Sequence, residues 1–284
     1  MKMKKVVVIG MGLIGGSIGK AILKKGLADE VIAVCRRQSS LDRAFKENAL
    51  TQGYVDNYEE AVSGADMIII ATPVVVIKNV LNDLVKVLKD SKVIITDVGS
   101  SKKEIVDYAA QSGGNFLFVG GHPLAGSEKS GVEYSTAELF EGSLCVLTDE
   151  ADVTDKKALK DVAEMWKAMG ARVEIQSPED HDRTIAFTSH LPHVAAYALV
   201  GALPPAPLSM LASGFKDTTR IASSDASLWS DIFLTNKENV LIAIERFKEV
   251  ILGIEKDIRE NNREELEKKL KNFQRAKNEF SEKN

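Results

Sequence analysis

Short apolar runs alternate with amphipathic segments as far as Ser177. The apolar runs are Val6 to Ile9, Val31 to Val34, Met67 to Ala71, Val93 to Thr96, Phe116 to Val119 and Leu144 to Leu147, and Arg172 to Ile175 alternates as a last strand. Apolar residues recur with helical spacing over Leu13 to Leu23, Ala44 to Leu50, Val76 to Leu88 and Asp155 to Met169. Short, mostly apolar runs are typical of parallel strands buried on both faces. The pattern predicts an α/β fold with a Rossmann-type, doubly wound, mostly parallel sheet.

The pattern changes at Ser177, after which no run of strand type occurs. Ser177 is a predicted N-cap, because Pro178 follows at the first helical position and two acids occupy the first turn. We therefore expect a dinucleotide-binding domain over residues 1–177 and an all-helical domain over residues 178–284. The first of its helices should run through Leu199 with a kink at Pro192.

Further helices are predicted towards the C-terminus. A proline-rich break from Leu203 to Pro207 precedes a short helix, and Asn239 to Leu252 and Arg263 to Phe280 are amphipathic. In the last of these, Leu266, Leu270, Phe273 and Phe280 form one stripe among Lys and Glu residues. Such a stripe indicates packing within the chain or a dimer interface.

Three glycines follow the first apolar run at G-x-G-x-x-G spacing: Gly10, Gly12 and Gly15. In the dinucleotide-binding motif the first makes a tight turn, the second lets the backbone approach a pyrophosphate, and the third lets the next helix pack against the strand. That helix begins with Leu13 and Ile14, whose N–H groups would face the phosphates. The motif predicts a dinucleotide site, and a merely glycine-rich turn is the alternative.

The residues at the end of the second predicted strand determine whether NAD or NADP is preferred. An acid at this place binds the ribose 2′-hydroxyl of NAD, but here the position holds Cys35. Arg36 and Arg37 follow, and then Gln38, Ser39 and Ser40. This set of donors favours NADP over NAD, because a 2′-phosphate accepts charge-assisted hydrogen bonds. The alternative is a solvated loop with Cys35 as a buried filler.

Composition and charge exclude several classes of protein. The 284 residues carry a net charge of −4, which gives no electrostatic reason to expect nucleic acid or a membrane as a partner. No apolar run reaches the length of a membrane span. The two cysteines, Cys35 and Cys145, provide no disulfide framework. A reducing cytoplasm is the expected location.

Candidate chemistry clusters where the predicted strands end. Thr72 and Pro73 follow one strand, and Thr72 is a candidate for contact with the cofactor, or else a turn residue. The next strand leads to Ser100 and Ser101. Ser101 with Glu104 has the spacing of a capping box, which predicts a structural role, whereas Ser100 is left as a hydroxyl for substrate or nicotinamide.

His122 follows another strand, held between a glycine pair and Pro123. A histidine with an ordinary pKa near 6.5 can accept a proton at neutral pH. We therefore interpret His122 as a catalytic base, the alternative being a surface turn.

The helical part contributes two further groups of polar residues. His190 and His193 share a helix face, but no second ligand pair of matching spacing exists, so no metal site is expected. His190 is assigned to substrate contact or to packing at the helix kink. Arg220 offers a planar fork for a carboxylate, which Asp217 could hold in place. Trp229 is an aromatic wall or a core residue.

Five segments together resemble the prephenate/arogenate dehydrogenases of tyrosine biosynthesis. They are GMGLIGGS, DVGS at residues 97–100, GGHPLAGSEKSG at 120–131, SHLPH at 189–193 and GFKDTTR at 214–220. The resemblance implies NAD(P)-dependent oxidative decarboxylation of prephenate to 4-hydroxyphenylpyruvate, or of arogenate. It also implies a homodimer formed through the helical domain and feedback inhibition by tyrosine.

The resemblance also implies roles for individual residues. His122 would take the proton of the ring hydroxyl, Ser100 would position that hydroxyl, and Arg220 would bind the side-chain carboxylate. The surrounding substrate-binding residues would be Ser127, Glu128, His190, Lys216 and Asp217. Two rival interpretations stay open. Another Rossmann dehydrogenase, such as a 3-hydroxyacid dehydrogenase or an imine reductase, would not need His122 and Arg220 together, and a nucleotide-binding redox sensor would need no base.

Overall fold

Six parallel strands form the central sheet of the computed structural model, which describes residues 2–88, 92–126, 129–151, 153–204 and 212–282. The strands are β1 (Met3–Ile9), β2 (Ala28–Cys35), β3 (Gln52–Val55), β4 (Met67–Ile70), β5 (Val93–Asp97) and β6 (Phe116–Val119). Their spatial order is β3-β2-β1-β4-β5-β6, the order of the doubly wound fold. The predicted fold class is confirmed. The order reverses between β1 and β4, and such folds bind ligands beyond the carboxyl ends of the strands at that point.

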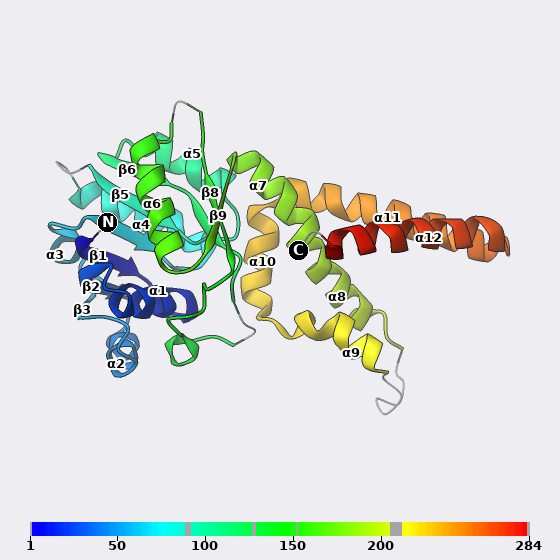
Figure 1. Cartoon of the computed structure of the whole chain (residues 1–284), viewed down its shortest axis with the longest axis horizontal. Coiled ribbons are helices and arrows are strands. Elements are labelled where there is room, and N and C mark those ends of the chain that lie inside the picture. Colours follow the sequence, from blue (N-terminus) through cyan, green and yellow to red (C-terminus); the bar gives the residue numbers. More distant parts are fainter. Residues whose placement is uncertain (1, 89–91, 127–128, 152, 205–211, 283–284) are drawn as a thin grey trace. The chain divides into compact units, whose positions relative to one another are not determined.

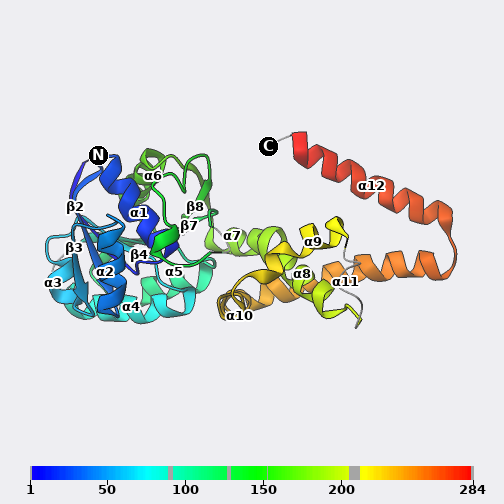
Figure 2. The ribbon, with the colours of Figure 1, turned by 90° about the horizontal axis from the view of Figure 1, so that it is seen from below.

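Each face of the sheet has its own apolar core. Val6 and Val8 of β1 join one core, and Val7 and Ile9 join the other. The first core is covered by α1 (Leu13–Lys24), α2 (Gln38–Lys46) and α6 (Lys156–Ala168), and the second by α3 (Tyr58–Val62), α4 (Val74–Val87) and α5 (Lys103–Gln111). Figures 1 and 2 show these helices on both sides of the sheet. Burial on both faces explains why the central strands lack polar alternation.

A second, three-stranded sheet carries one of the predicted site residues. It consists of β7 (Gly121–Pro123), β8 (Leu144–Thr148) and β9 (Arg172–Gln176), with β7 antiparallel and β9 parallel to β8. The sequence correctly predicts β8 and β9 but not their separation from the main sheet. It also misses β7, because three residues that include a proline do not have the pattern of a strand. A short 3-10 helix, η1 (Val132–Tyr134), lies between β7 and β8.

The predicted helix from Ala44 to Leu50 is wrong. The observed helix α2 ends at Lys46, and Asn48 adopts a left-handed φ of 54°. Ala49 and Leu50 are nonetheless buried, because they reach the core from the loop that leads to β3. Apolar spacing alone therefore misplaced this helix, and the adjoining β3 and α3 were not predicted.

The described chain after Ser177 contains helices and no strand, as predicted. Its elements up to residue 237 are α7 (Pro178–Ile185), a π turn η2 (Ala186–His190), α8 (Leu191–Gly201), α9 (Ser213–Thr219), the 3-10 turn η4 (Arg220–Ser223) and α10 (Ala226–Thr235). Ser177 caps α7 by accepting from the N–H of Asp180 at 3.1 Å, as predicted. A π turn stands just before Pro192, where the kink is predicted. The helix expected before Ser213 lies outside the described residues.

The chain divides into two compact units, residues 1–237 and 238–284. The second unit contains almost all of α11 (Lys237–Arg259) and all of α12 (Arg263–Glu282), which form a helical hairpin (Figure 2). Lys269 joins its two arms, with Nζ 2.6 Å from the Asp257 carboxylate and 3.0 Å from the Gly253 carbonyl oxygen. None of the described helices is both long and apolar enough to cross a membrane.

Candidate active site

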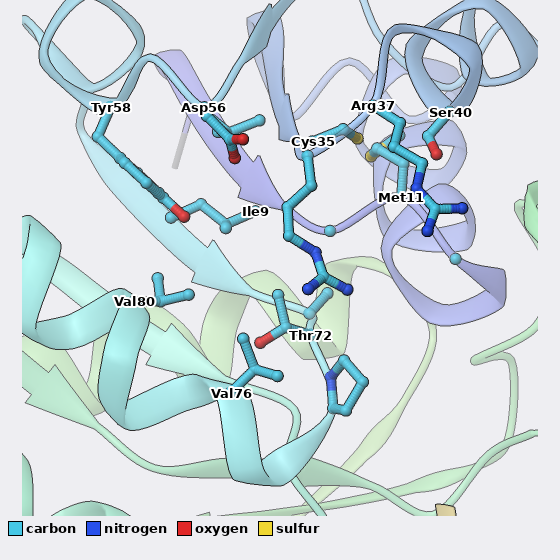
Figure 3. A pocket seen from close by; sticks show the side chains of 16 residues that line it. Ile9, Met11, Cys35, Arg37, Ser40, Asp56, Tyr58, Thr72, Val76 and Val80 are labelled. Atoms are coloured by element: carbon cyan, nitrogen blue, oxygen red, sulfur yellow. The ribbon is translucent and has the colours of Figure 1, made fainter.

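A cavity of about 350 Å³ lies where β1, β2 and β4 end (Figure 3). Seven of the predicted cofactor residues line it: Gly10, Gly12, Cys35, Arg36, Arg37, Thr72 and Pro73. The predicted residues Leu13, Ile14, Gly15 and Ser39 are not among its lining, whereas Ser40 is. Its position at the reversal of strand order is the usual ligand site of this fold.

The glycine motif fits a bound dinucleotide. A Cβ on Gly10 would lie 2.7 Å from the Ala71 carbonyl oxygen, and one on Gly15 would lie 1.9 Å from the Gly10 carbonyl oxygen, so both glycines are required by packing. A Cβ on Gly12 would meet no atom within 4 Å. Packing within the protein therefore gives no reason for glycine at position 12, whereas close approach of a ligand backbone does.

Unpartnered polar groups surround the same cavity. Helix α1 begins after Gly12, which has no side chain to cap the first N–H groups, and this end of the helix carries partial positive charge. The buried hydroxyl of Thr72 has no hydrogen-bond partner among the described residues. Anionic phosphates and a ribose or amide group would satisfy these donors, so the residues present fit a dinucleotide.

At the end of β2 the cavity holds charges of both signs. Figure 3 shows Arg37 beside Ser40, and Asp56 and Tyr58 beyond Cys35. Burial raises the pKa of the Cys35 thiol, so this residue is a neutral filler. Sequence analysis missed Asp56 and Tyr58, because they follow β3, which was not recognised as a strand. The sequence signal that could have identified Asp56 as a cavity residue is its position directly after the edge strand β3.

The strand that carries His122 is held by a buried ion pair. Lys102 is fully buried, contacts the Asp97 carboxylate and donates to the Gly121 carbonyl oxygen at 2.8 Å. Asp97 in turn accepts from the N–H of Gly121 at 3.1 Å. A Cβ on Gly121 would lie 2.8 Å from the Asp97 carbonyl oxygen, so glycine is needed beside the histidine. This pair fixes the backbone that presents His122.

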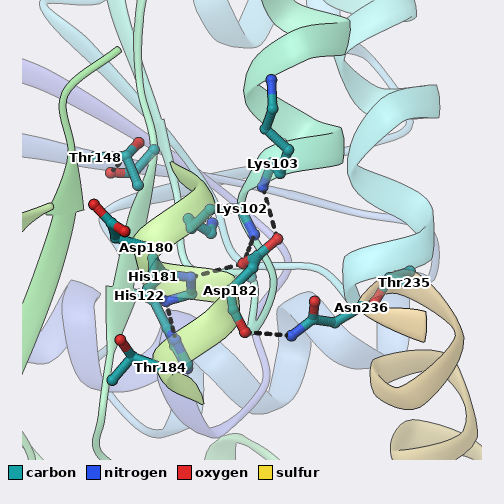
Figure 4. Close-up of polar contacts among 12 residues, drawn as sticks. Lys102, Lys103, His122, Thr148, Asp180, His181, Asp182, Thr184, Thr235 and Asn236 are labelled. Atoms are coloured by element: carbon teal, nitrogen blue, oxygen red, sulfur yellow. Dashed lines mark hydrogen bonds and ion pairs between the residues drawn. The ribbon is translucent and has the colours of Figure 1, made fainter. Parts of the chain in front are cut away.

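His122 begins a chain of hydrogen bonds that the sequence did not predict. Nδ1 of His122 lies 2.9 Å from Nε2 of His181, and Nδ1 of His181 lies 2.8 Å from the Asp182 carboxylate (Figure 4). That carboxylate accepts from the backbone N–H groups of Lys102 at 2.7 Å and Lys103 at 3.0 Å. Within the described chain, Nε2 of His122 has no hydrogen-bond partner.

Burial, followed by the nearby His181 and Lys102, lowers the pKa of His122 well below its usual 6.5. The pKa of His181 is also lowered by burial, against the opposing effect of Asp182. Both imidazoles are therefore neutral at neutral pH, and His122 can accept a proton there.

The two serines after β5 differ from prediction in one respect. The capping box at Ser101 is wrong: its hydroxyl is buried without a hydrogen-bond partner among the described residues, and helix α5 begins at Lys103. Asp182, 80 residues away from Lys102, caps this helix instead. Ser100 is partly buried in the loop after β5, and the structure shows no hydrogen bond between it and His122.

The same network extends to the second histidine pair. Nδ2 of Asn236 donates to the Asp182 carbonyl oxygen at 2.7 Å and lies 3.3 Å from Nδ1 of His190. His190 is buried, and this burial lowers its pKa to about 4. The ring of Trp229 stacks on His193 at a centroid distance of 3.3 Å and meets the edge of His190 at 6.1 Å. Trp229 is thus an aromatic wall beside both histidines.

The predicted anion clamp lies on α9 and η4. The segment from Gly214 to Arg220 is helical, and Lys216, Asp217 and Arg220 are exposed. No ion pair joins Asp217 to Arg220, so the prediction that Asp217 holds the Arg220 fork is wrong. Ser127 and Glu128 lie outside the described residues. Among the described residues, no three potential metal ligands come together.

Comparison with known proteins identifies the family. A model described as prephenate dehydrogenase, nucleotide-binding domain, matches residues 18–175, and one described as prephenate dehydrogenase, dimerization domain, matches residues 177–272. The chain belongs to the prephenate dehydrogenase family. It is thus an oxidoreductase family member, with a nucleotide-binding domain of the Rossmann type.

Individual relatives cover most of the chain. Prephenate dehydrogenase of Bacillus subtilis (strain 168) is 37% identical over 279 residues, which cover 96% of this chain and 74% of the relative. The crystal structure of Aquifex aeolicus prephenate dehydrogenase in complex with hydroxyphenyl propionate and NAD+ has a TM-score of 0.90 and 36% identity, covering 99% of each chain. Synechocystis arogenate dehydrogenase has a TM-score of 0.83 and 27% identity, covering 97% of this chain and 99% of its own.

Proposed function

We propose that this protein catalyses the NAD(P)-dependent oxidative decarboxylation of prephenate to 4-hydroxyphenylpyruvate. The observation that carries this proposal is the neutral His122 imidazole, whose Nδ1 is engaged by His181 and whose Nε2 has no partner among the described residues. His122 comes after the carboxyl end of β6, and the nucleotide cavity lies at the carboxyl ends of β1, β2 and β4. Both therefore lie on the side of the main sheet where its strands end. Two of the relatives reported above carry the name prephenate dehydrogenase.

In the proposed reaction, Nε2 of His122 takes the proton of the ring hydroxyl. The O–H electron pair then forms the carbonyl as hydride leaves the same carbon. When the carboxylate leaves as carbon dioxide, the electron pair of the broken C–C bond enters the ring, which becomes aromatic, and the carbonyl oxygen takes a proton back to become the phenol hydroxyl. Bound NAD(P)+ supplies the hydride acceptor. The chain itself must supply a base, an anion clamp and alignment of the reactants.

We assign substrate contacts to the residues implied by the family motifs. Arg220 binds the side-chain carboxylate by a bidentate pair, and Lys216 and Asp217 extend the polar surroundings. Ser100 positions the ring hydroxyl, and Ser127 and Glu128 complete the pocket. His190 contributes from the helical part, where its position beside Trp229 and Asn236 supports the assignment.

For the cofactor we propose a preference for NADP. Arg36, Arg37 and Ser40 line the cavity where a 2′-phosphate would lie, and Cys35 replaces the usual acid. Asp56 lines the same cavity and opposes this preference, because its carboxylate repels a phosphate. NAD is the alternative, and the Aquifex aeolicus relative was solved in complex with NAD+.

We further propose a homodimer formed through the helical domain, residues 178–284, with residues 1–177 as the dinucleotide-binding domain. The family model that matches residues 177–272 is described as a dimerization domain, and several apolar side chains of α11 and α12 are exposed. A cytoplasmic location is supported by the two buried, unpaired cysteines. Feedback inhibition by tyrosine is proposed from the family resemblance and is tested by adding tyrosine to the assay.

The experiment that tests the function supplies prephenate and arogenate side by side, each with NAD and NADP, and follows absorbance of the reduced nicotinamide. We expect the highest kcat/KM with prephenate. A clear excess with arogenate would support the activity named for the Synechocystis relative. Absence of reduction with both substrates and both cofactors would contradict the proposed function.

A further inference from the structure

All four histidines of the chain belong to one group of contacting side chains. His122 and His181 are bonded to each other, Asp182 and Asn236 connect them to His190, and His193 stacks on Trp229 beside His190. Because a neutral imidazole carries one proton, each hydrogen bond to a group of fixed polarity decides which ring nitrogen holds it.

The direction of donation along these hydrogen bonds is set at the N-terminus of α5. The backbone N–H groups of Lys102 and Lys103 can only donate, and both donate to the Asp182 carboxylate. An ionised carboxylate can only accept, so Nδ1 of His181 must donate to Asp182. His181 is neutral, and its Nε2 therefore carries a lone pair.

The same reasoning then passes to His122. Its Nδ1 faces the lone pair of His181 Nε2 at 2.9 Å, so His122 must hold its proton on Nδ1. Nε2 of His122 is then the unprotonated nitrogen. It is also the nitrogen that has no partner in the described part of the chain.

We propose that His181 is a positioning residue that, held by Asp182, fixes the proton of His122 on Nδ1 and leaves Nε2 as the proton acceptor. The proposal rests on the proposed function, in which His122 is the base. In triads a carboxylate orients the base histidine directly, whereas here a neutral imidazole stands between carboxylate and base. When Nε2 of His122 takes the hydroxyl proton, His122 becomes a positively charged imidazolium. This ring remains hydrogen-bonded to His181, which is hydrogen-bonded to the Asp182 carboxylate.

The first test reads the proton positions directly. The carbonyl oxygen of Ser189, 3.0 Å from Nδ1 of His193, requires a proton on that nitrogen, and the amide of Asn236 requires a lone pair on Nδ1 of His190. Long-range ¹H–¹⁵N correlation spectra of the full-length protein labelled with [¹⁵N]histidine should therefore show three imidazoles protonated at Nδ1 and one at Nε2. The variants His190→Gln and His193→Gln assign the signals. A His122 or His181 ring protonated at Nε2 would overturn the proposal.

The second test is kinetic. In His181→Leu the acceptor for His122 Nδ1–H is lost, so kcat should fall by at least about 10-fold, and by no more than the 10²–10⁴-fold that the general base itself contributes. KM for prephenate should stay unchanged. His181→Gln, whose amide oxygen can accept from His122, should retain most of kcat. Equal losses in both variants, or a loss confined to KM, would indicate packing alone and contradict the proposal.

The two tests separate this inference from the proposed function. The spectra need neither substrate nor turnover, and neither they nor their assignment uses a His181 variant, so they decide the inference even where His181→Leu does not fold. A wild-type protein that fails to oxidise prephenate, yet shows the expected proton positions, would contradict the function and leave the His122–His181–Asp182 arrangement standing.

Discussion

At the scale of single residues, the proposed chemistry depends on Nε2 of His122. In His122→Asn the amide cannot accept a proton in the transition state, so kcat should fall by about 10²–10⁴-fold. Binding of prephenate should change little, because asparagine keeps the polarity of the site. Steady-state rates and isothermal titration with substrate measure the two effects separately. An unchanged kcat would remove His122 from the reaction.

The charges at the end of β2 lead to a cofactor prediction. Asp56→Asn removes a carboxylate from the cavity, so the ratio of kcat/KM for NADP over NAD should rise by about 5- to 10-fold, about 1 kcal/mol for a partly screened charge. Arg36→Ala should weaken NADP binding. Asp29→Asn makes the same charge change near the start of β2 and serves as the control. Unchanged NADP affinity in Arg36→Ala would contradict the proposed preference.

At the scale of elements, the beginning of α5 shows where sequence reasoning fails. Ser101 and Glu104 have the spacing of a capping box, but Asp182 supplies the cap from α7. A capping box is a local pattern, and a carboxylate from a distant segment leaves no local trace. Lys102 was overlooked for the same reason, since its burial against Asp97 exists only in the folded chain.

This correction makes a stability prediction. Ser101→Ala should leave the free energy of unfolding within about 0.5 kcal/mol of wild type or raise it, because the hydroxyl is buried and has no hydrogen-bond partner in the part of the chain that the structure describes. Asp182→Ala should lower it by about 2 kcal/mol or more, because two N–H groups at the start of α5 lose their acceptor. Urea titrations of both variants test this. A fall of about 1–2 kcal/mol in the free energy of unfolding of Ser101→Ala would instead support the predicted capping box.

Elements and residues set by short-range patterns were predictable. Strands β1, β4 and β5 are apolar runs, and the three glycines lie between the end of β1 and the first turn of α1 with the spacing of a dinucleotide-binding motif. The lining of the cavity also includes Asp56, which could not be predicted in the same way, because the strand before it, β3, is not an apolar run. His181 was hidden similarly: it looks like a first-turn neighbour of the acids in α7, and only the fold brings it to His122.

At the scale of the whole molecule, the buried histidines make stability depend on pH. Their pKa values are lowered by burial, so the unfolded chain binds more protons below about pH 6.5 and the free energy of unfolding falls as pH falls. For His190, with a pKa of about 4, the loss between pH 7.5 and pH 5 is about 2 kcal/mol. Urea unfolding at both pH values measures it, and His190→Gln should reduce the difference by that amount. Equal stability at both pH values would contradict the neutral, buried state of these rings.

Assembly is the second property of the whole molecule. On α11 and α12 many large apolar side chains remain exposed, among them Leu252 at 59% and Phe273 at 46%. If this surface is the dimer interface, Leu252→Glu removes about 1.5–3 kcal/mol of apolar burial per copy, and twofold symmetry doubles the loss. The dimer dissociation constant should rise by at least about 100-fold in sedimentation-velocity runs over a concentration series. Gln274→Glu adds the same charge at an exposed position of α12 and should leave the dimer intact. A Leu252→Glu protein that sediments as the wild type would place the interface elsewhere.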